Sequence, residues 1–263
     1  LFERLEIAEA EGFDYVHALV ESTKQAFLLR DRHVTDPRWM SIDARTLLAD
    51  DYLARLAAQI DPTRALAWPH EGEPGDTVWM GCIDGEGRTV SFIQSTYWEF
   101  GSGVVLPSTG VLWQNRGVGF SLDPRARQAL APGRKPFHTL NPALASLNDG
   151  RTIVYGTMGG EGQPQTQSAV FTRHVLYGQP LQQAIDAPRW LLGRTWGEGT
   201  TSLKLESRFD PTLIAALRQA GHQVDVIDAY SDTMGHAGGI TRHADGRLEG
   251  GADPRSDGSV AAF

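Results

Sequence analysis

Hydrophobic positions recur at helical spacing over the first part of the chain. In residues 8–31, apolar side chains return at steps of three and four residues with charged residues between them, which predicts an amphipathic helix. Residues 46–60 show the same pattern, and Asp61-Pro62 ends it. A polar, turn-rich run at 69–75 then separates these two predicted helices from the rest of the chain.

After residue 76 the pattern changes to one typical of strands. Residues 77–84 and 89–97 are rich in β-branched and aromatic side chains, and the glycine-rich turn between them predicts a β-hairpin. Further short strands are expected at 104–106, 111–113, 152–155, 202–206, 223–227, 239–242 and 247–249. We expect an exposed loop at 122–136 and helices at 165–177, 180–186 and 211–220, the last ending at Gly221. This order favours an α+β fold with mostly antiparallel sheets.

Composition narrows the classes of partner and cofactor. The 263 residues are 41% hydrophobic and 21% charged, which is enough for a packed core. The net charge of −8 and the lack of a long basic run argue against a nucleic-acid partner, and no apolar run reaches the roughly 18 residues of a membrane helix. Cys82 is the only cysteine, and we expect it to be buried in its strand. His138, His222 and His236 match no metal-motif spacing, so neither a metal nor another cofactor is expected.

Several short segments carry an ordered resemblance to a known family. They are Asp76-Thr77 at the start of a strand, Phe100 through Val105, Gly110 followed by Asn115, Pro136 through Pro142, Gly159-Gly160 after a strand, and Asp253 through Gly258. In this order they resemble the small subunit of the γ-glutamyltransferase family, a branch of the N-terminal-nucleophile hydrolases, and residues 8–40 resemble the end of the large subunit. The resemblance implies a four-layer αββα sandwich. It also divides the chain into a helical part with a processing linker, 1–76, and a small catalytic subunit, 77–263.

The resemblance further implies a reaction and the residues that perform it. The precursor cuts its own backbone between Asp76 and Thr77, and the released threonine attacks an amide while its own α-amine takes the hydroxyl proton. A free α-amine suits this role, because its pKa of about 7.7–8.0 lies near neutral pH. Gly159 and Gly160 match the pair whose N–H groups form the oxyanion hole. Ser95 matches a hydroxyl that supports the nucleophile, with a structural cross-strand hydroxyl pair as the alternative.

The predicted donor pocket departs from the family pattern. Tyr97 stands where the family has Asn, Arg116 where it has Gln, Gly119 where it has Asp, and His138-Thr139 where it has Ser-Ser. Without the acidic residue, an α-ammonium group in the pocket lacks a counter-charge, while Arg116 adds a positive charge. We therefore expect an acyl donor that carries a carboxylate and needs no ammonium group, bound by the residues at positions 97, 116, 138 and 139. A surface or ion-pair role for Arg116 and a structural role for His138 stay open.

This substitution pattern is similar to that of the γ-glutamyltransferase-like amidohydrolases, with oxamate amidohydrolases as the nearest group. The leading hypothesis is a self-processing N-terminal-threonine amidohydrolase that cleaves a small carboxylate-bearing amide such as oxamate through an acyl-enzyme. One alternative is a γ-glutamyltransferase or glutathione hydrolase, and another is a cephalosporin (glutaryl) acylase. The third alternative is an unprocessed, non-catalytic homologue or a fragment.

The resemblance also predicts a protein partner. We expect the chain to lack the first part of a longer precursor, and that large-subunit portion is the expected partner in a heterodimer after cleavage or in a dimer of heterodimers. Neither nucleic acid nor a membrane is expected as a partner. The compartment stays open, with the cytoplasm favoured over the periplasm.

Overall fold

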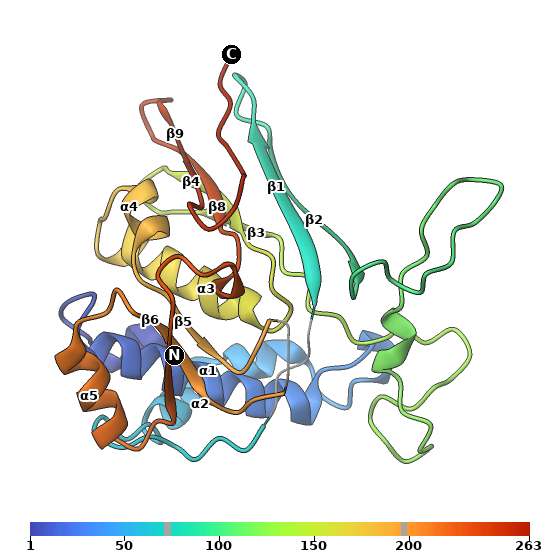
Figure 1. Cartoon of the computed structure of the whole chain (residues 1–263), viewed down its shortest axis with the longest axis horizontal. Helices are drawn as coiled ribbons and strands as arrows, with labels where there is room; N and C mark the ends of the chain where they lie inside the picture. Colours follow the sequence, from blue (N-terminus) through green and yellow to red (C-terminus); the bar gives the residue numbers. More distant parts are fainter. Residues whose placement is uncertain (71–74, 196–198) are drawn as a thin grey trace.

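A four-stranded antiparallel sheet lies at the centre of the computed structural model, which describes residues 1–70, 75–195 and 199–263 (Figure 1). Its strands, in spatial order, are β3 (Ala143–Ser146), β4 (Thr152–Gly156), β8 (Gly238–Arg242) and β9 (Leu248–Ala252). Helices α3 (Gly162–Phe171) and α4 (Leu181–Asp186) contact this sheet, and so does the hairpin of β1 (Asp76–Ile83) and β2 (Thr89–Tyr97). The hairpin and the sheet form the two stacked β-layers of the molecule.

Trp79 fixes the hairpin against the central sheet. Its ring lies over Gly156 of β4 and Gly238 of β8, where an added Cβ would come within 2.1 and 2.6 Å of the indole. The indole Nε1 donates a hydrogen bond to Ser91 Oγ at 2.9 Å, so the N–H group of the packed ring has a hydrogen-bond acceptor. Both glycines are therefore required by this close contact, and the indole sets the distance between the two β-layers.

The opposite face of the hairpin is exposed and largely apolar. Its outward side chains are Val78, Met80, Val90 and Phe92. Cys82 shares this outer face and is exposed, so the prediction of a buried cysteine is wrong. The reason is the two-residue period of a strand, which places Cys82 with Met80 rather than with Trp79 and Gly81.

A smaller three-stranded sheet packs against the long N-terminal helix. Strand β5 (Trp190–Leu192) is antiparallel to β6 (Leu203–Glu206), and β6 is parallel to β7 (Val224–Ile227). The parallel pair needs a crossover, which α5 (Pro211–Gln219) supplies. Asp210 caps this helix by accepting from Thr212 N at 2.7 Å, and Gly221 follows it at φ +100°.

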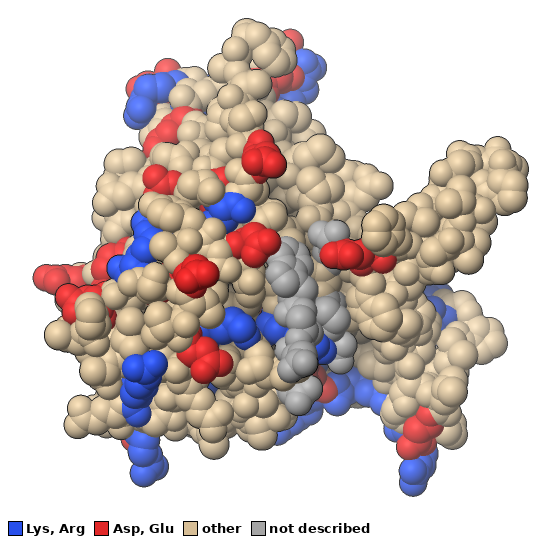
Figure 2. Space-filling model, in the orientation of Figure 1, with Lys and Arg blue, Asp and Glu red and all other residues tan. Residues whose placement is uncertain are grey.

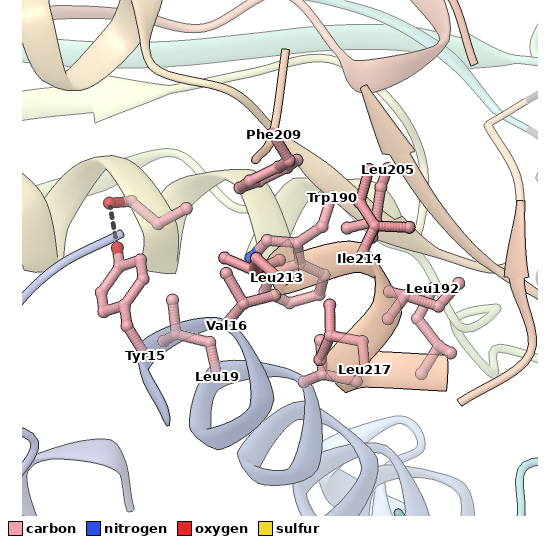
Figure 3. Close-up of a cluster of buried hydrophobic side chains, with 13 residues drawn as sticks. Tyr15, Val16, Leu19, Trp190, Leu192, Leu205, Phe209, Leu213, Ile214 and Leu217 are labelled. Carbon is pink, nitrogen blue, oxygen red and sulfur yellow. Dashed lines mark hydrogen bonds between the residues drawn. The ribbon is translucent and has the colours of Figure 1, made fainter. Parts of the chain in front are cut away.

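The main hydrophobic core joins the first helix to this small sheet (Figure 3). Val16 and Leu19 of α1 (Phe13–His33) pack with Trp190 of β5 and with Leu213 and Leu217 of α5. At the edge of this core the Tyr15 hydroxyl donates to Ala169 O at 3.2 Å, and burial raises the pKa of Tyr15 to about 12. Residues on both sides of position 76 therefore share one core.

Most predicted elements are present, with shifted ends. The first helix is α1, the second divides into a 3₁₀ turn at Ala44–Leu48 and α2 (Asp50–Ala57), and the predicted helix at 165–177 becomes α3 followed by a π-helical turn at Thr172–Leu176. The predicted α+β class is confirmed, while the sequence patterns did not predict the short strands β3 and β5.

The predicted strands at 104–106 and 111–113 form an arm instead. A single bridge joins Val105 to Leu112, and the segment projects away from the end of β2 (Figure 1). Residues 100–115 contain no charged side chain, and Figure 2 shows this arm as an uncharged projection. Within the described ranges, no helix has the length and apolar character needed to cross a membrane.

Candidate active site

Thr77 lies in a β-bulge at the beginning of β1. The register shifts just after the Asp76–Tyr97 pair, so that Thr77 alone faces two residues of β2, Ser95 and Thr96. Bulges redirect side chains locally, and they are frequent next to active sites. The structure therefore brings Thr77 and Ser95 to facing positions on one hairpin.

Tyr97 ends β2 in an unfavourable backbone conformation. Its φ is +84°, in the left-handed region that non-glycine residues rarely adopt, at a cost on the order of 1–3 kcal/mol. The Tyr97 N–H donates to Ser95 Oγ at 2.9 Å, and the buried ring packs against Trp98. Strain is thus located at the residue that pairs with Asp76, directly beside the predicted cleavage junction.

The glycine pair after β4 forms a tight buried turn. Gly159 has φ +120° and Gly160 has φ +53°, so both use the conformational freedom of glycine. Their carbonyls accept from Gly162 N at 2.7 Å and Gln163 N at 3.2 Å, which starts α3. In the described part of the chain, the N–H groups of this pair donate no hydrogen bond. These N–H groups are therefore available to bind an oxyanion.

The predicted cleavage junction reaches this turn. An added Cβ on Gly75 would lie 3.1 Å from Gly160 Cα and 3.9 Å from the Tyr97 ring. Gly75 N also donates to Thr195 O at 3.1 Å, which holds the main chain in place just before β1. Residues 71–74, the middle of the predicted polar linker, lie outside the described residues.

Several of the predicted site residues line two cavities. One of about 270 Å³ is lined by Thr77, Met158 and His236 together with residues of the C-terminal segment. The other, about 720 Å³, is lined by Tyr97, Thr139 and further residues. Tyr97 is the β-partner of Asp76, so both cavities reach the start of the hairpin.

The larger cavity has an aromatic and charged wall. Its aromatic residues are Phe27, Trp68, Tyr97, Trp98 and Phe137. Among the described residues its two carboxylates both pair with Arg30 of α1, Asp31 at 2.7 Å and Glu161 at 2.8 Å. Gly119 also lines this cavity and contributes no side chain to it.

Arg116 is a buried cation beside this cavity. It is 7% exposed, and its guanidinium carbon lies 4.0 Å from the centre of the Tyr97 ring. Across the described ranges no carboxylate lies within ion-pair distance of Arg116, and its buried Nη2 has no hydrogen-bond acceptor. Burial lowers the pKa of the guanidinium, because the charged form loses hydration. A buried cation without a protein anion suits an anionic ligand.

Of the predicted residues His138 and Thr139, His138 lies close enough to this cation for its charge to act on the imidazole. Partial burial lowers the pKa of His138, and the positive charges of Arg116 and Lys135 lower it further, so the imidazole is neutral at pH 7. His138 Nδ1 accepts from Leu140 N at 3.2 Å. The Thr139 side chain is buried, and its Oγ1 has no partner in the described structure. Tyr97 and Thr139 thus line one cavity, while Arg116 contacts Tyr97 and lies close enough to His138 for its charge to affect the imidazole.

A buried ion network holds the loop that carries His236. Asp253 Oδ2 accepts from Arg189 Nη1 and from Ala237 N, each at 2.6 Å, and Arg255 Nη1 lies 3.1 Å from Asp253 Oδ1. Burial alone would raise the pKa of Asp253, but the two guanidinium groups hold it below its usual range. Burial also lowers the pKa of Arg189 to about 10. Sequence patterns did not indicate Arg189, because its partners lie far along the chain.

One group of buried residues has the composition of a metal site. The ligand atoms of His17, Glu21 and His222 all lie within 4.8 Å of one another. However, Lys24 Nζ lies 2.7 Å from Glu21 Oε1, and His17 Nδ1 is hydrogen-bonded to His222 Nε2 at 2.9 Å. The buried ammonium already balances the carboxylate, so this cluster is a hydrogen-bonded network that joins α1 to the turn after α5.

Two stacked β-layers with helices on the sheet, and a threonine at the start of a strand beside a Gly-Gly turn, define the fold of the N-terminal-nucleophile hydrolases. The chain belongs to the gamma-glutamyltranspeptidase family, whose sequence profile matches residues 2–263. This confirms the family resemblance that the short motifs predicted.

Individual relatives extend this assignment. The chain is 59% identical, over 99% of its length, to the oxamate amidohydrolase proenzyme of Klebsiella pneumoniae subsp. pneumoniae, and 46% identical to the glutathione hydrolase-like YwrD proenzyme of Bacillus subtilis over 97%. These matches cover 49% and 48% of the two relatives, so the chain spans about half the length of the curated proteins it matches.

A solved structure gives the same result. The cephalosporin acylase from Bacillus halodurans is 38% identical to this chain and superimposes with a TM-score of 0.86, covering 98% of this chain and 46% of the acylase. The gamma-glutamyltranspeptidase from Pseudomonas nitroreducens shares the fold at 21% identity, with a TM-score of 0.58 over 70% of this chain.

Proposed function

We propose that this chain is the catalytic half of a self-processing amidohydrolase whose substrate is a small amide bearing a carboxylate. The observation that carries the proposal is Arg116, a buried guanidinium with no carboxylate partner in the described residues. The similarity to an oxamate amidohydrolase proenzyme supports the same class of substrate. Oxamate, an amide with an adjacent carboxylate, is the leading candidate.

In the proposed reaction, the backbone is first cut before Thr77, which becomes the first residue of the new chain. Its α-amine then takes the hydroxyl proton, and the oxygen attacks the substrate carbonyl. The N–H groups of Gly159 and Gly160 stabilise the resulting oxyanion. Ammonia leaves, and water hydrolyses the acyl-enzyme. Ser95, opposite Thr77 in the bulge, supports the nucleophile's hydroxyl.

The carboxylate of the substrate binds on the side of Arg116. The Nη2 of Arg116 and the buried Oγ1 of Thr139 supply hydrogen-bond donors that no described protein group uses. Tyr97 holds the guanidinium by a cation–π contact, and neutral His138 borders it. No described carboxylate other than the two paired with Arg30 lines this cavity, which disfavours a γ-glutamyl donor with its α-ammonium group.

A second candidate substrate is a longer carboxylated acyl amide, such as a glutaryl amide. Two observations favour it: the volume of about 720 Å³ exceeds what oxamate fills, and the cephalosporin acylase of Bacillus halodurans is 38% identical to this chain. The catalytic steps are the same for both candidates. Only the distance between the carboxylate and the scissile carbonyl differs.

The partner in this proposal is the preceding half of the same precursor. The exposed apolar face of β1–β2 and the uncharged arm at 100–115 are surfaces of the kind that a permanent partner covers. The curated relatives are proenzymes about twice as long as this chain, which supports a heterodimer after cleavage.

The test compares ammonia release from oxamate with turnover of glutaryl-p-nitroanilide and γ-glutamyl-p-nitroanilide by the full-length protein. Preferred hydrolysis of oxamate supports the proposal, and preferred hydrolysis of the glutaryl amide supports the second candidate. Preferred γ-glutamyl turnover contradicts the assignment of the Arg116 pocket. A wild-type protein that stays uncleaved and hydrolyses none of the three is the non-catalytic homologue.

A further inference from the structure

Two glutamines of α3 grip the main chain of one residue beside the proposed pocket. Gln163 Oε1 accepts from Asn141 N at 3.1 Å, and Gln167 Nε2 donates to Asn141 O at 2.7 Å. The two glutamines are four residues apart and lie on the same face of the helix. The main-chain donor and acceptor of Asn141 are therefore both held by α3.

Each end of this arrangement lies at a different part of the proposed site. Gln163 is fully buried, and its own N–H donates to Gly160 O at 3.2 Å, at the oxyanion turn. Asn141 Nδ2 donates to Thr139 O at 2.7 Å, at the carboxylate side of the pocket. Through these bonds, a rigid helix joins the group that would bind the scissile carbonyl to the group that would bind the carboxylate.

We infer that Gln163 and Gln167 are positioning residues that set the substrate length, by fixing the distance between the Gly159–Gly160 turn and Thr139. This inference rests on the proposed function. A monoamide whose carbonyl and carboxylate match that distance binds both ends at once, and a shorter or longer one loses a contact. Loss of either glutamine's hydrogen bond to Asn141 should weaken substrate binding and reduce the preference for one substrate length. The Gly159–Gly160 turn should keep its own backbone hydrogen bonds.

The test uses the full-length precursor with Gln163→Met, Gln167→Met and the double variant, and Gln219→Met as the matched control. Gln219 is the exposed last residue of α5, far along the chain from both groups. Self-cleavage and helical circular dichroism report whether each variant folds. Steady-state kinetics are then measured on the free monoamides oxamate, succinamate and glutaramate, which differ only in chain length.

We expect each single variant to raise KM for the preferred monoamide about tenfold, with kcat changed less than about threefold and with a narrower spread of kcat/KM across the three lengths. Because both bonds hold the same residue, the double variant should change KM by less than the product of the single effects. The control should match the wild type.

Wild-type turnover with an unchanged KM and an unchanged length preference in both single variants overturns the assignment while leaving the proposed function intact. A change in KM in the double variant that equals the product of the two single changes also contradicts the assignment, because the two hydrogen bonds would then act independently. A cleaved wild-type protein that hydrolyses none of the three monoamides overturns the proposed function, and the length assignment with it. If Gln163→Met fails to fold, the half-buried Gln167 carries the same test alone.

Discussion

Gly75 lies against Gly160, with only 3.1 Å between an added Cβ on the first and the Cα of the second. The segment just before the predicted cleavage junction therefore touches the turn that is proposed to stabilise the oxyanion. In the proposed function, both the cleavage of the backbone and the later hydrolysis of an amide need an oxyanion site at Thr77. One glycine turn can serve both reactions only if the junction approaches it this closely.

Gly75→Ala is expected to slow self-cleavage by roughly tenfold or more, because the added methyl group pushes the junction away from Gly160. The measurement is the time course of chain cleavage on a denaturing gel. Gly85, in the hairpin turn with nothing within 4 Å of its Cβ position, is the matched control as Gly85→Ala. Equal cleavage rates for the two variants would show that the contact at Gly75 has no role.

Arg116→Ala is expected to raise KM for oxamate by roughly 10- to 100-fold, the value of one charge-assisted hydrogen bond. Turnover of oxamide, which has no carboxylate, should change little. The control is Arg125→Ala, whose side chain is 88% exposed and paired with Asp123. A similar loss with both amides would mean that Arg116 supports the fold rather than the carboxylate.

Asp253→Ala should lower the free energy of unfolding by about 3–5 kcal/mol, because it leaves the buried Arg189 guanidinium without an ion-pair partner among the described residues, while Arg255 keeps its pair with Glu206. Urea unfolding measures this loss. Asp84→Ala removes an ion pair with Arg88 and hydrogen bonds from the main-chain N–H groups of Glu86 and Arg88 at the exposed hairpin turn, where the loss should be much smaller. If the two variants lose equal stability, the buried network is not the stabilising element described above.

The stability of the fold should decrease in mild acid through His222. Burial, followed by the charges of Lys24 and the neighbouring His17, lowers the pKa of His222 from 6.5 to about 3. Below pH 6.5 the unfolded chain binds a proton at this site and the folded chain does not. Stability is therefore present above pH 6.5 and is lost by about 1.4 kcal/mol per pH unit as the pH falls toward 3.

The check is thermal unfolding between pH 7 and pH 4 for the wild type and for His222→Gln, which cannot take up this proton. The variant should have a shallower dependence of its free energy of unfolding on pH, by about one proton. Identical slopes would assign the acid sensitivity to other groups.

The hairpin shows why part of this structure could be predicted from sequence. Residues 77–84 and 89–97 have a strong alternation and a glycine turn, and β1 and β2 form there with ends shifted by a residue at most. The alternation alone did not show which face is buried. That is decided by the glycines of β4 and β8, which accept the indole of Trp79 and leave Cys82 on the outer face.

The site was predictable where local motifs carry it and not where distant residues meet. The Gly159–Gly160 turn follows from its sequence, because glycine adopts positive φ values at the least steric cost. Gln163 bonds to Asn141, which lies 22 positions away, and Arg189 pairs with Asp253, which lies 64 positions away. No local sequence pattern indicates either contact. Only packing of the sheets and helices brings these groups together.

The most direct measurement for the central claim is the intact mass of the full-length precursor and of its Thr77→Ala variant after purification. The wild type should yield two polypeptides, the smaller of which begins at Thr77, and brief exposure to oxamate should release ammonia. The variant should remain one polypeptide and release none. A wild type that stays uncleaved, or a variant that cleaves at the same junction and hydrolyses oxamate, would contradict the assignment of Thr77 as the nucleophile.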